Sequence, residues 1–259
     1  MKLLVPSFAS FDEYERKARV FPALLVMLPL VIPVLWGLGP KSPMLTALLL
    51  ALSGCGATYC IASIARSSGK SLEEKLFHAW GGKPTTLILR HRDHFLDTYS
   101  KRRYHEEIEA KLGVKMPSAE EETGDPKYAD EIYEGAIRKL REATRGKTKS
   151  LLHRENISYG FHRNMMALRR LGSITCLMGS FVGLAMYKET FNSLPSFSIP
   201  ESLHSQLGGM ISIGISLMLL FVWRNFHREA VKNAAYCYAE RLLEELTHLP
   251  KKRKTTLKI

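Results

Sequence analysis

Residues 20–39 read VFPALLVMLPLVIPVLWGLG and contain no charged side chain. A run of about 20 apolar residues has the length that an α-helix needs to cross the hydrocarbon core of a bilayer. Three prolines, Pro22, Pro29 and Pro33, interrupt this run. Membrane helices tolerate such prolines when neighbouring groups satisfy the carbonyls that each ring leaves free. We therefore predict a bent transmembrane helix here.

Three further uncharged stretches follow, at residues 44–65, 171–187 and 207–223. A short linker joins the first pair of stretches and predicts an antiparallel hairpin, and a wider polar loop joins the second pair. The stretch at 171–187 is close to the shortest length that crosses a bilayer, so a re-entrant segment is the alternative there. A cleaved signal peptide is a poorer interpretation of the first stretch, because the charged residues 12–19 precede it.

The four stretches predict an all-α integral membrane protein with two transmembrane helical hairpins and a helical cytoplasmic domain inserted between them. Lys and Arg lie mostly beside the spans rather than at the hairpin tips, which predicts that both termini and the central domain are cytoplasmic. The predicted organisation is an N-terminal helix at 1–19, hairpins at 20–65 and 171–223, a basic helical domain at 66–170, and a C-terminal helix with a basic tail at 224–259.

Local signals predict several helices in the central domain. Ser71 and Glu74 have the spacing of a capping box. A charged helix is expected from Thr98 to Leu112, closed by Gly113, and another begins at Asp125-Pro126, an N-cap followed by proline. The apolar stripe expected on this second helix is Tyr128, Ile132, Ala136 and Leu140.

The helices next to the second hairpin are expected to continue across the membrane boundary. Residues 151–168 predict a helix that runs into the third span, and the fourth span is expected to continue into a C-terminal helix. The acidic run at 120–125 is interpreted as a solvated surface. The apolar stripe of the C-terminal helix must pack on the central domain or on another subunit, and consists of Val231, Ala235, Tyr238, Leu242 and Leu246.

The chain lacks the common catalytic motifs, namely GxxxxGK[ST], HExxH, CxxC and GxSxG. We therefore predict a protein that is not an enzyme, with no catalytic residue, metal or cofactor. Residues 81–86, GGKPTT, are similar to a phosphate loop but lack its spacing. His91 and His94 beside two aspartates offer a metal site or a lipid-directed enzyme as alternatives, although a polar helix surface explains them more simply.

Basic and aromatic side chains alternate in the first half of the central domain. Cations bind phosphates and aromatic rings stack on bases, so this pattern predicts a nucleotide or oligonucleotide ligand. A mixed-charge surface, or attraction to an anionic leaflet, is the alternative. The residues predicted to bind the ligand are Lys83, Arg90, Arg92, Lys101, Arg102, Arg103 and Tyr104.

The spans contain small and weakly polar residues but no Asp, Glu, Lys or Arg. Ion-coupled transporters usually place an ionisable group at mid-membrane, so that class is disfavoured. Faces rich in Gly and Ser serve either helix packing within the subunit or the lining of a path. Because four helices are too few to enclose a wide pore, a channel would require a homo-oligomer, such as a tetramer, gated by dewetting of an apolar constriction.

The paired hairpins at 20–65 and 171–223 and the basic segments RHRDH (90–94) and KRRY (101–104) give a layout that resembles a family of bacterial anti-phage defence effectors. These are membrane channel effectors of the Hailong type. The resemblance lies in architecture and transfers no functional residue. It implies a homo-oligomeric ion channel in the bacterial inner membrane, controlled by a nucleic-acid ligand, which depolarises the membrane during infection.

The leading hypothesis is a ligand-regulated membrane effector, an oligomeric ion channel controlled by a nucleotide or oligonucleotide bound to the cytoplasmic domain. Its expected partners are the lipid bilayer, further copies of itself, the ligand, and a nucleotidyltransferase that makes the ligand. The alternative is a non-catalytic membrane anchor or scaffold that recruits a cytoplasmic partner.

Overall fold

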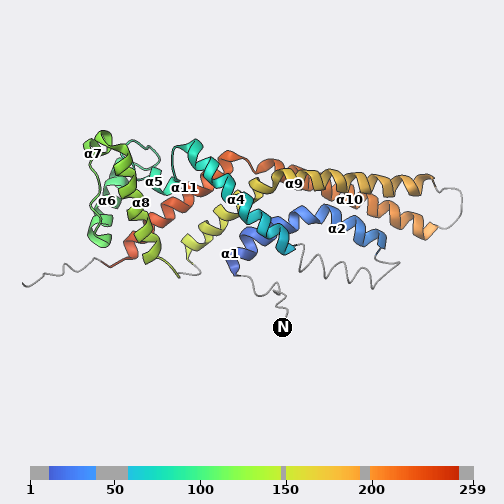
Figure 1. Cartoon of the computed structure of the whole chain (residues 1–259). Coiled ribbons are helices and arrows are strands. Elements are labelled where there is room, and N and C mark those ends of the chain that lie inside the picture. Colours follow the sequence, from blue (N-terminus) through green and yellow to red (C-terminus); the bar gives the residue numbers. More distant parts are fainter. Residues whose placement is uncertain (1–11, 39–57, 147–149, 193–198, 251–259) are drawn as a thin grey trace, which may run out of the picture. The chain divides into compact units, whose positions relative to one another are not determined.

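The computed structural model describes residues 12–38, 58–146, 150–192 and 199–250. All regular elements within these ranges are helical (Figure 1). They belong to two compact units, and each unit is assembled from two separate parts of the sequence. The first unit contains residues 1–73 and 160–230, and the second contains residues 74–159 and 231–259.

Among the residues that the structure describes, three helices are long and apolar enough to cross a membrane, which indicates a membrane protein. The candidate spans are Glu13–Trp36, Leu151–Lys188 and Gln206–Asn225. The stretch predicted at 44–65 falls largely outside the described residues, so the first hairpin stays a prediction. Helix α9 runs without a break from Leu151 to Asn192, which confirms that the helix at 151–168 continues into the third span and favours a span over a re-entrant segment.

Two of the three prolines in the first span, Pro22 and Pro33, have a neighbour on α9 close to the carbonyl four residues before them. This span consists of α1 (Glu13–Glu15), a π-helical stretch (Arg16–Val20) and α2 (Phe21–Leu38). Pro22 has no N–H to donate to the Ala18 carbonyl, which accepts a 2.6 Å hydrogen bond from Asn164 Nδ2 of α9. Pro33 likewise cannot donate to the Pro29 carbonyl, against which Gly179 of α9 packs closely.

The three helices α2, α9 and α10 (Ile199–Asn225) lie side by side in Figure 1. Small residues at their contacts let them approach one another closely. A Cβ added at Gly179 would lie 2.4 Å from the Pro29 carbonyl oxygen, and one added at Gly183 would lie 2.8 Å from the carbonyl oxygen of Gly209. Ser212 Oγ donates to the Gly179 carbonyl at 3.1 Å. These contacts favour the packing interpretation of the Gly/Ser faces over the lining of a path.

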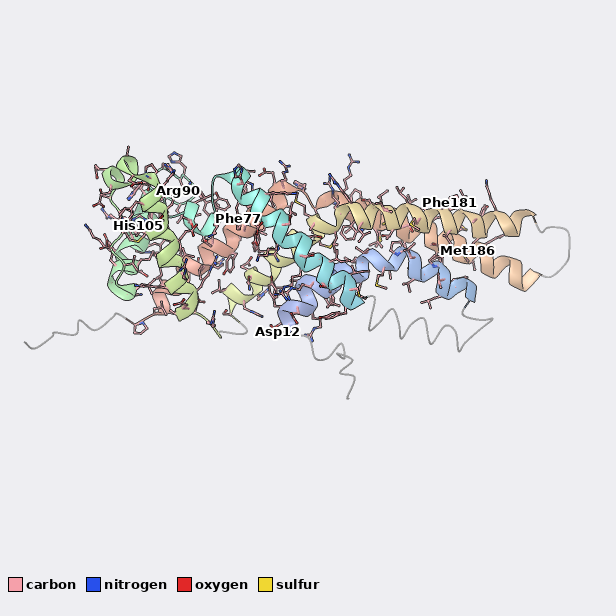
Figure 2. All side chains as sticks on the ribbon, in the orientation of Figure 1. Asp12, Phe77, Arg90, His105, Phe181 and Met186 are labelled. Carbon is pink, nitrogen blue, oxygen red and sulfur yellow. The ribbon has the colours of Figure 1, made fainter. Side chains whose placement is uncertain are left out.

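Large apolar side chains occupy the opposite face of α9. Ile174, Leu177, Met178 and Phe181 are exposed, and Phe181 is labelled in Figure 2. Residues at positions i, i+3, i+4 and i+7 of a helix share one face. An apolar face of this kind on a membrane helix suits contact with lipid tails or with another subunit.

The second unit is built around a core of apolar side chains from three helices and from the segment 87–89 at the end of α5 (Pro84–Leu87). The three helices are α6 (Thr98–Leu112), α8 (Pro126–Ala143) and α11 (Arg228–Glu244), which continues into a 3₁₀ turn, η4 (Glu245–His248). Two short helices, α5 and α7 (Ala119–Gly124), complete the unit. The fully buried core side chains include Ile88, Ile108, Tyr133, Leu140, Leu242 and Leu246.

The predicted ends of α6 and α8 are confirmed by their capping contacts. Asp97 accepts a hydrogen bond from the Ser100 N–H at the start of α6, and Gly113 ends that helix at φ 64°, a left-handed conformation that glycine adopts without strain. Asp125 accepts from the Tyr128 N–H, and Pro126 occupies the first turn of α8. The C-terminal part of the predicted stripe on α11 packs on the central domain, since Leu242 and Leu246 belong to its core and Tyr238 packs against that core.

Three predictions on local structure were wrong. Ser71 and Glu74 do not start a helix, because α4 runs from Thr58 to Trp80 and includes them. The fourth span does not continue directly into α11, because α10 ends at Asn225. Asn225 uses its side chain to donate to the Phe221 carbonyl at 3.0 Å, and asparagine is a common residue at helix ends.

The third wrong prediction is the stripe on α8. Tyr128 is exposed, and the buried face consists of Ala129, Tyr133, Ala136, Ile137 and Leu140. Steps of four residues exceed the helical repeat of about 3.6, so a stripe drawn at that spacing drifts away from the face that points to the core. The stripe was therefore correct at Ala136 and Leu140 but not at its beginning.

Candidate functional site

The seven residues predicted to bind a nucleotide all lie in the second unit, but they do not converge on one surface. Lys83 precedes α5, Arg90 and Arg92 lie in the turns that follow α5, and the other four are on α6. Two of them, Lys101 and Tyr104, are buried. The structure therefore divides the predicted cluster into residues that support the fold and residues that face solvent.

Arg90 and Lys101 hold the segment between α5 and α6. The Arg90 guanidinium makes two hydrogen bonds of 2.7 Å to the Asp130 carboxylate and a third, of 3.0 Å, to the Gly81 carbonyl. Lys101 Nζ donates to the carbonyls of His91 and Asp93, and burial lowers the pKa of its ammonium group although Asp93 and Glu122 act in the opposite direction. Both cations already have protein partners, so neither is free to bind a ligand.

Glu122 is the centre of a buried polar cluster. Its side chain is only 4% exposed and accepts hydrogen bonds of 2.7 Å from the His91 N–H and from the Tyr133 hydroxyl. Burial alone would raise the pKa of this carboxyl, but the bonds from His91, Tyr133 and Arg92 together hold it below its ordinary value. The prediction that the acidic run is a solvated surface was therefore wrong at Glu122, although Glu120 and Glu121 are exposed.

The histidines near Glu122 also have structural partners. His105 is buried, lies 2.8 Å through Nε2 from the Leu89 carbonyl, and contacts the His91 ring edge-to-face at 5.0 Å between centroids. Burial lowers the pKa of His105, and the nearby His91 and Lys101 lower it further. His91 Nε2 lies 3.0 Å from the Pro117 carbonyl. Among the described residues there is no group of three or more potential metal ligands.

One exposed surface does combine cations with an aromatic ring. Tyr99, Arg102 and Arg103 lie on one face of α6, three and four residues apart, and all three are exposed. Tyr104, the aromatic residue predicted to contact the ligand, is instead buried beneath the Arg103 guanidinium, which lies 4.9 Å from the centre of its ring. We refer to Tyr99, Arg102 and Arg103 as the α6 surface.

A second polar feature is a cleft of about 100 Å³ between the α5 region and α8, here called the α5–α8 cleft. Its cations are Lys83, Arg138 and Arg141, and the Lys83 ammonium pairs with Glu134 at 2.9 Å. The motif GGKPTT contained a signal for the α5 side of this cleft. The α8 side depends on tertiary packing and follows about 50 residues later, so spacing alone did not reveal it. The lining residues are Lys83, Thr85, Thr86, Glu134, Ile137, Arg138 and Arg141.

The same unit carries an open, mainly apolar groove of about 630 Å³. Val114 and Met116 line it from the segment after α6, and Tyr128 and Ile132 line it from α8. Tyr128 and Ile132 are the two residues of the predicted α8 stripe that do not belong to the buried face. Their apolar character therefore has a surface explanation rather than a core one.

The second unit thus presents the α6 surface, the α5–α8 cleft and an apolar groove, and the first unit contains helices suited to a membrane. The acidic, histidine and arginine residues at its centre mainly stabilise the fold. No protein-family model, curated protein or solved structure matches this chain.

Proposed function

We propose that this protein is a ligand-regulated membrane effector that forms an oligomeric ion channel. In this proposal the helical unit binds an anionic nucleotide or oligonucleotide, and binding changes the conductance of the membrane helices. The bacterial inner membrane, a role in anti-phage defence by depolarisation, and a nucleotidyltransferase that supplies the ligand belong to the same proposal through the resemblance in architecture.

The observation that carries the proposal is the course of α9. Residues 151–159 of this helix belong to the second unit and residues 160–192 belong to the first, so the candidate span Leu151–Lys188 has residues in both units. The chain also passes between the units within α4 and within α11. Helices resist bending, so a ligand that displaces the second unit has helical segments through which to act on the spans.

The α6 surface supports a nucleic-acid ligand. Arg102 and Arg103 present guanidinium groups that suit phosphate, and the exposed Tyr99 presents a ring on which a base can stack. Arg102 has only a loose pairing with Glu106, at 3.7 Å between two strongly exposed side chains. Such exposed pairs contribute little to stability, so a phosphate can replace the carboxylate at small cost.

Ion flux through the purified protein in liposomes, with and without short DNA or RNA oligomers, tests the proposal. We expect an oligomer to change the flux, and the double variant Arg102→Glu/Arg103→Glu to raise the oligomer concentration at half effect by at least about tenfold, since each lost phosphate contact weakens binding. Lys127→Glu, at an exposed position of α8 outside the α6 surface, is the matched control. Unchanged oligomer sensitivity in the double variant would remove the α6 surface as the site.

The second candidate function is a membrane scaffold that recruits a partner protein. The apolar groove beside Tyr128 and Ile132 favours it, because exposed apolar grooves commonly receive a helix or peptide. The use of Gly179, Gly183 and Ser212 for packing within the subunit is also compatible with a protein that conducts nothing. Absence of ion flux with every DNA or RNA oligomer, in protein that is correctly assembled, would favour the scaffold over the channel.

A further inference from the structure

We propose that the α5–α8 cleft is a binding site for a phosphoryl group. This inference deepens the proposed function, on which it rests, because it names the group of the ligand that the helical unit would bind and the residues that would hold it. The residues concerned are Lys83, Thr85, Thr86, Arg138 and Arg141.

Two hydroxyl groups in the cleft lining have no hydrogen-bond partner. Thr85 and Thr86 are 4% and 3% exposed, and neither Oγ1 atom makes a hydrogen bond within the part of the chain that the structure describes. Leaving a buried hydroxyl without a partner costs free energy, so such groups are rare and call for an explanation. A bound oxyanion supplies acceptor oxygens to which both hydroxyls can donate.

The charge of the cleft matches a phosphate. Three cations and one carboxylate line it, and the carboxylate, Glu134, is already paired with Lys83. Arg138 and Arg141 lie on the same face of α8, three residues apart, and neither has an ion-pair partner among the described residues. They leave two positive charges for a group that carries about −1.5 to −2 at pH 7. Guanidinium groups also match the geometry of phosphate oxygens better than ammonium groups do.

The segment that carries Lys83 and the two threonines is held in place by contacts that lie outside the cleft. Gly81 has φ 79°, which permits the tight turn after α4, and its carbonyl accepts the hydrogen bond from Arg90. Arg90 is anchored in turn by Asp130 of α8. The two sides of the cleft are therefore tied together by an ion pair that does not itself line the cleft, so the site is formed before a ligand arrives.

The size of the cleft selects a single group rather than a whole nucleotide. Its volume is about 100 Å³, whereas about 10–15 Å³ already accommodates one water molecule. A tetrahedral oxyanion fits such a space, and the remainder of a larger ligand would extend over the surrounding surface. A terminal phosphate, of a nucleotide or of a lipid headgroup, is therefore the expected occupant.

Isothermal titration calorimetry of the full-length protein in a zwitterionic detergent tests this inference, with inorganic phosphate as the first probe. We expect phosphate to bind, and Thr85→Val, Thr86→Val and Arg138→Gln each to weaken its affinity by at least about tenfold. Thr123→Val and Arg145→Gln, exposed positions of the same unit outside the cleft, are the matched controls and should bind as the unaltered protein does.

Stability separates a lost ligand contact from a lost fold. Because the threonine hydroxyls have no protein partner, Thr85→Val and Thr86→Val should melt at the same temperature as the unaltered protein or higher when phosphate is absent. Phosphate should raise the melting temperature of the unaltered protein and not that of the variants. Unimpaired phosphate binding by both threonine variants would overturn the inference.

Two further probes identify the source of the phosphoryl group. Adenosine monophosphate that binds more tightly than phosphate, with the same dependence on Thr85 and Thr86, would indicate a nucleotide, and dihexanoyl phosphatidic acid that binds more tightly would indicate a lipid headgroup. Failure of all three probes to bind overturns the cleft as a phosphoryl site. That result leaves the oligomer-dependent flux and its dependence on Arg102 and Arg103 unaffected, so the two proposals fail separately.

Discussion

At the residue scale, Glu122 is a buried carboxylate at the centre of a polar cluster in the helical unit. Two backbone N–H groups and a tyrosine hydroxyl converge on this carboxylate, and it joins α7 to α8 and to the turn that follows α5. Hydrogen bonds to a buried charged group stabilise more than neutral ones do, and removing the charge leaves their partners buried. The unit therefore owes part of its stability to one ionised side chain.

Replacing Glu122 with Gln should lower the local stability of the helical unit by about 2–3 kcal/mol, because an amide nitrogen would then face hydrogen-bond donors. Hydrogen–deuterium exchange of peptides from α7 and α8 in the detergent-solubilised protein measures this change. Glu131→Gln, at an exposed position on α8, is the matched control. Equal exchange in both variants would show that the Glu122 cluster is dispensable.

His105 predicts a dependence of stability on pH. Burial depresses the pKa of this imidazole in the folded protein, with His91 and Lys101 acting in the same direction and Glu122 against them. The unfolded state then binds the proton more strongly, so stability is complete above pH about 6.5 and is lost as pH falls toward the folded-state pKa, by up to about 1.4 kcal/mol per pH unit.

We expect exchange of α6 peptides, corrected for the intrinsic effect of pH, to accelerate between pH 7.5 and pH 5.5. His105→Gln should reduce this acceleration, because glutamine can still donate to the Leu89 carbonyl but does not titrate. His94→Gln, at an exposed position, should retain it. A pH response that survives in His105→Gln would assign the effect to another group.

Sequence reasoning at this scale identified the residue types but not their roles. Arg90 and Lys101 were selected for their charge, yet Asp130 lies 40 positions from Arg90 along the chain and forms its ion pair only after folding. Tyr99 and Tyr104 each lie within two residues of a Lys or Arg in the sequence. Only tertiary packing determines that Tyr104 is buried and Tyr99 is exposed. Charge is visible in a sequence, whereas the partner that satisfies it is not.

At the element scale, close packing of α9 against α2 and α10 depends on glycine. An alanine Cβ at position 179 would meet the Pro29 carbonyl oxygen at 2.4 Å, and that atom belongs to backbone that cannot rotate away. On the same bundle, a Cβ at Gly214 meets nothing within 4 Å. The two glycines therefore form a natural pair of test and control.

Gly179→Ala should destabilise the membrane helices by about 1–3 kcal/mol through overpacking. Gly214→Ala should leave stability unchanged or raise it by up to about 1 kcal/mol, since alanine favours the helix. Thermal unfolding followed by size-exclusion chromatography in detergent compares the two variants. Equal melting temperatures would mean that α2 and α9 are not packed as closely as their backbones indicate.

Helix ends were predictable where the signal is chemical and local. Asp125 caps α8 and Gly113 ends α6 as expected, because each signal depends only on the residues next to it. Ser71 misled because the same spacing occurs within α4, where the preceding residues are already helical. The end of α10 at Asn225 was missed because the apolar stripe that begins at Val231 was interpreted as a continuation of the fourth span.

At the scale of the whole molecule, membrane topology follows from the distribution of Lys and Arg and stays a prediction. Cys237 offers a way to test it, because it is exposed and belongs to the unit predicted to be cytoplasmic. With Cys55, Cys60 and Cys176 replaced by serine or alanine, a membrane-impermeant maleimide should label Cys237 in inside-out vesicles and not in right-side-out vesicles. The reverse pattern would invert the predicted orientation.

All-helical architecture and the presence of membrane spans were accessible from hydropathy, because span length is set by the thickness of the bilayer. The assignment of the helices to the two units could not be predicted from hydropathy. The sequence separates α11 from the central segment by two apolar stretches, yet Tyr236, Leu242 and Leu246 belong to the same core as Ile108 and Leu140. Contacts between residues so far apart in the chain leave no local pattern.

This discontinuity also fixes an order of events during synthesis. A ribosome makes residues 74–159 of the helical unit before the candidate spans in α9 and α10. Only afterwards does it make the residues of α11 that complete the core of this unit. Until then the apolar side chains around Ile108 and Leu140 lack part of their cover, and such surfaces attract chaperones and proteases. A nascent chain therefore completes the core of its helical unit only after α10, the last described candidate span, has been made, and a chain whose translation stops before α11 leaves apolar side chains of that core uncovered.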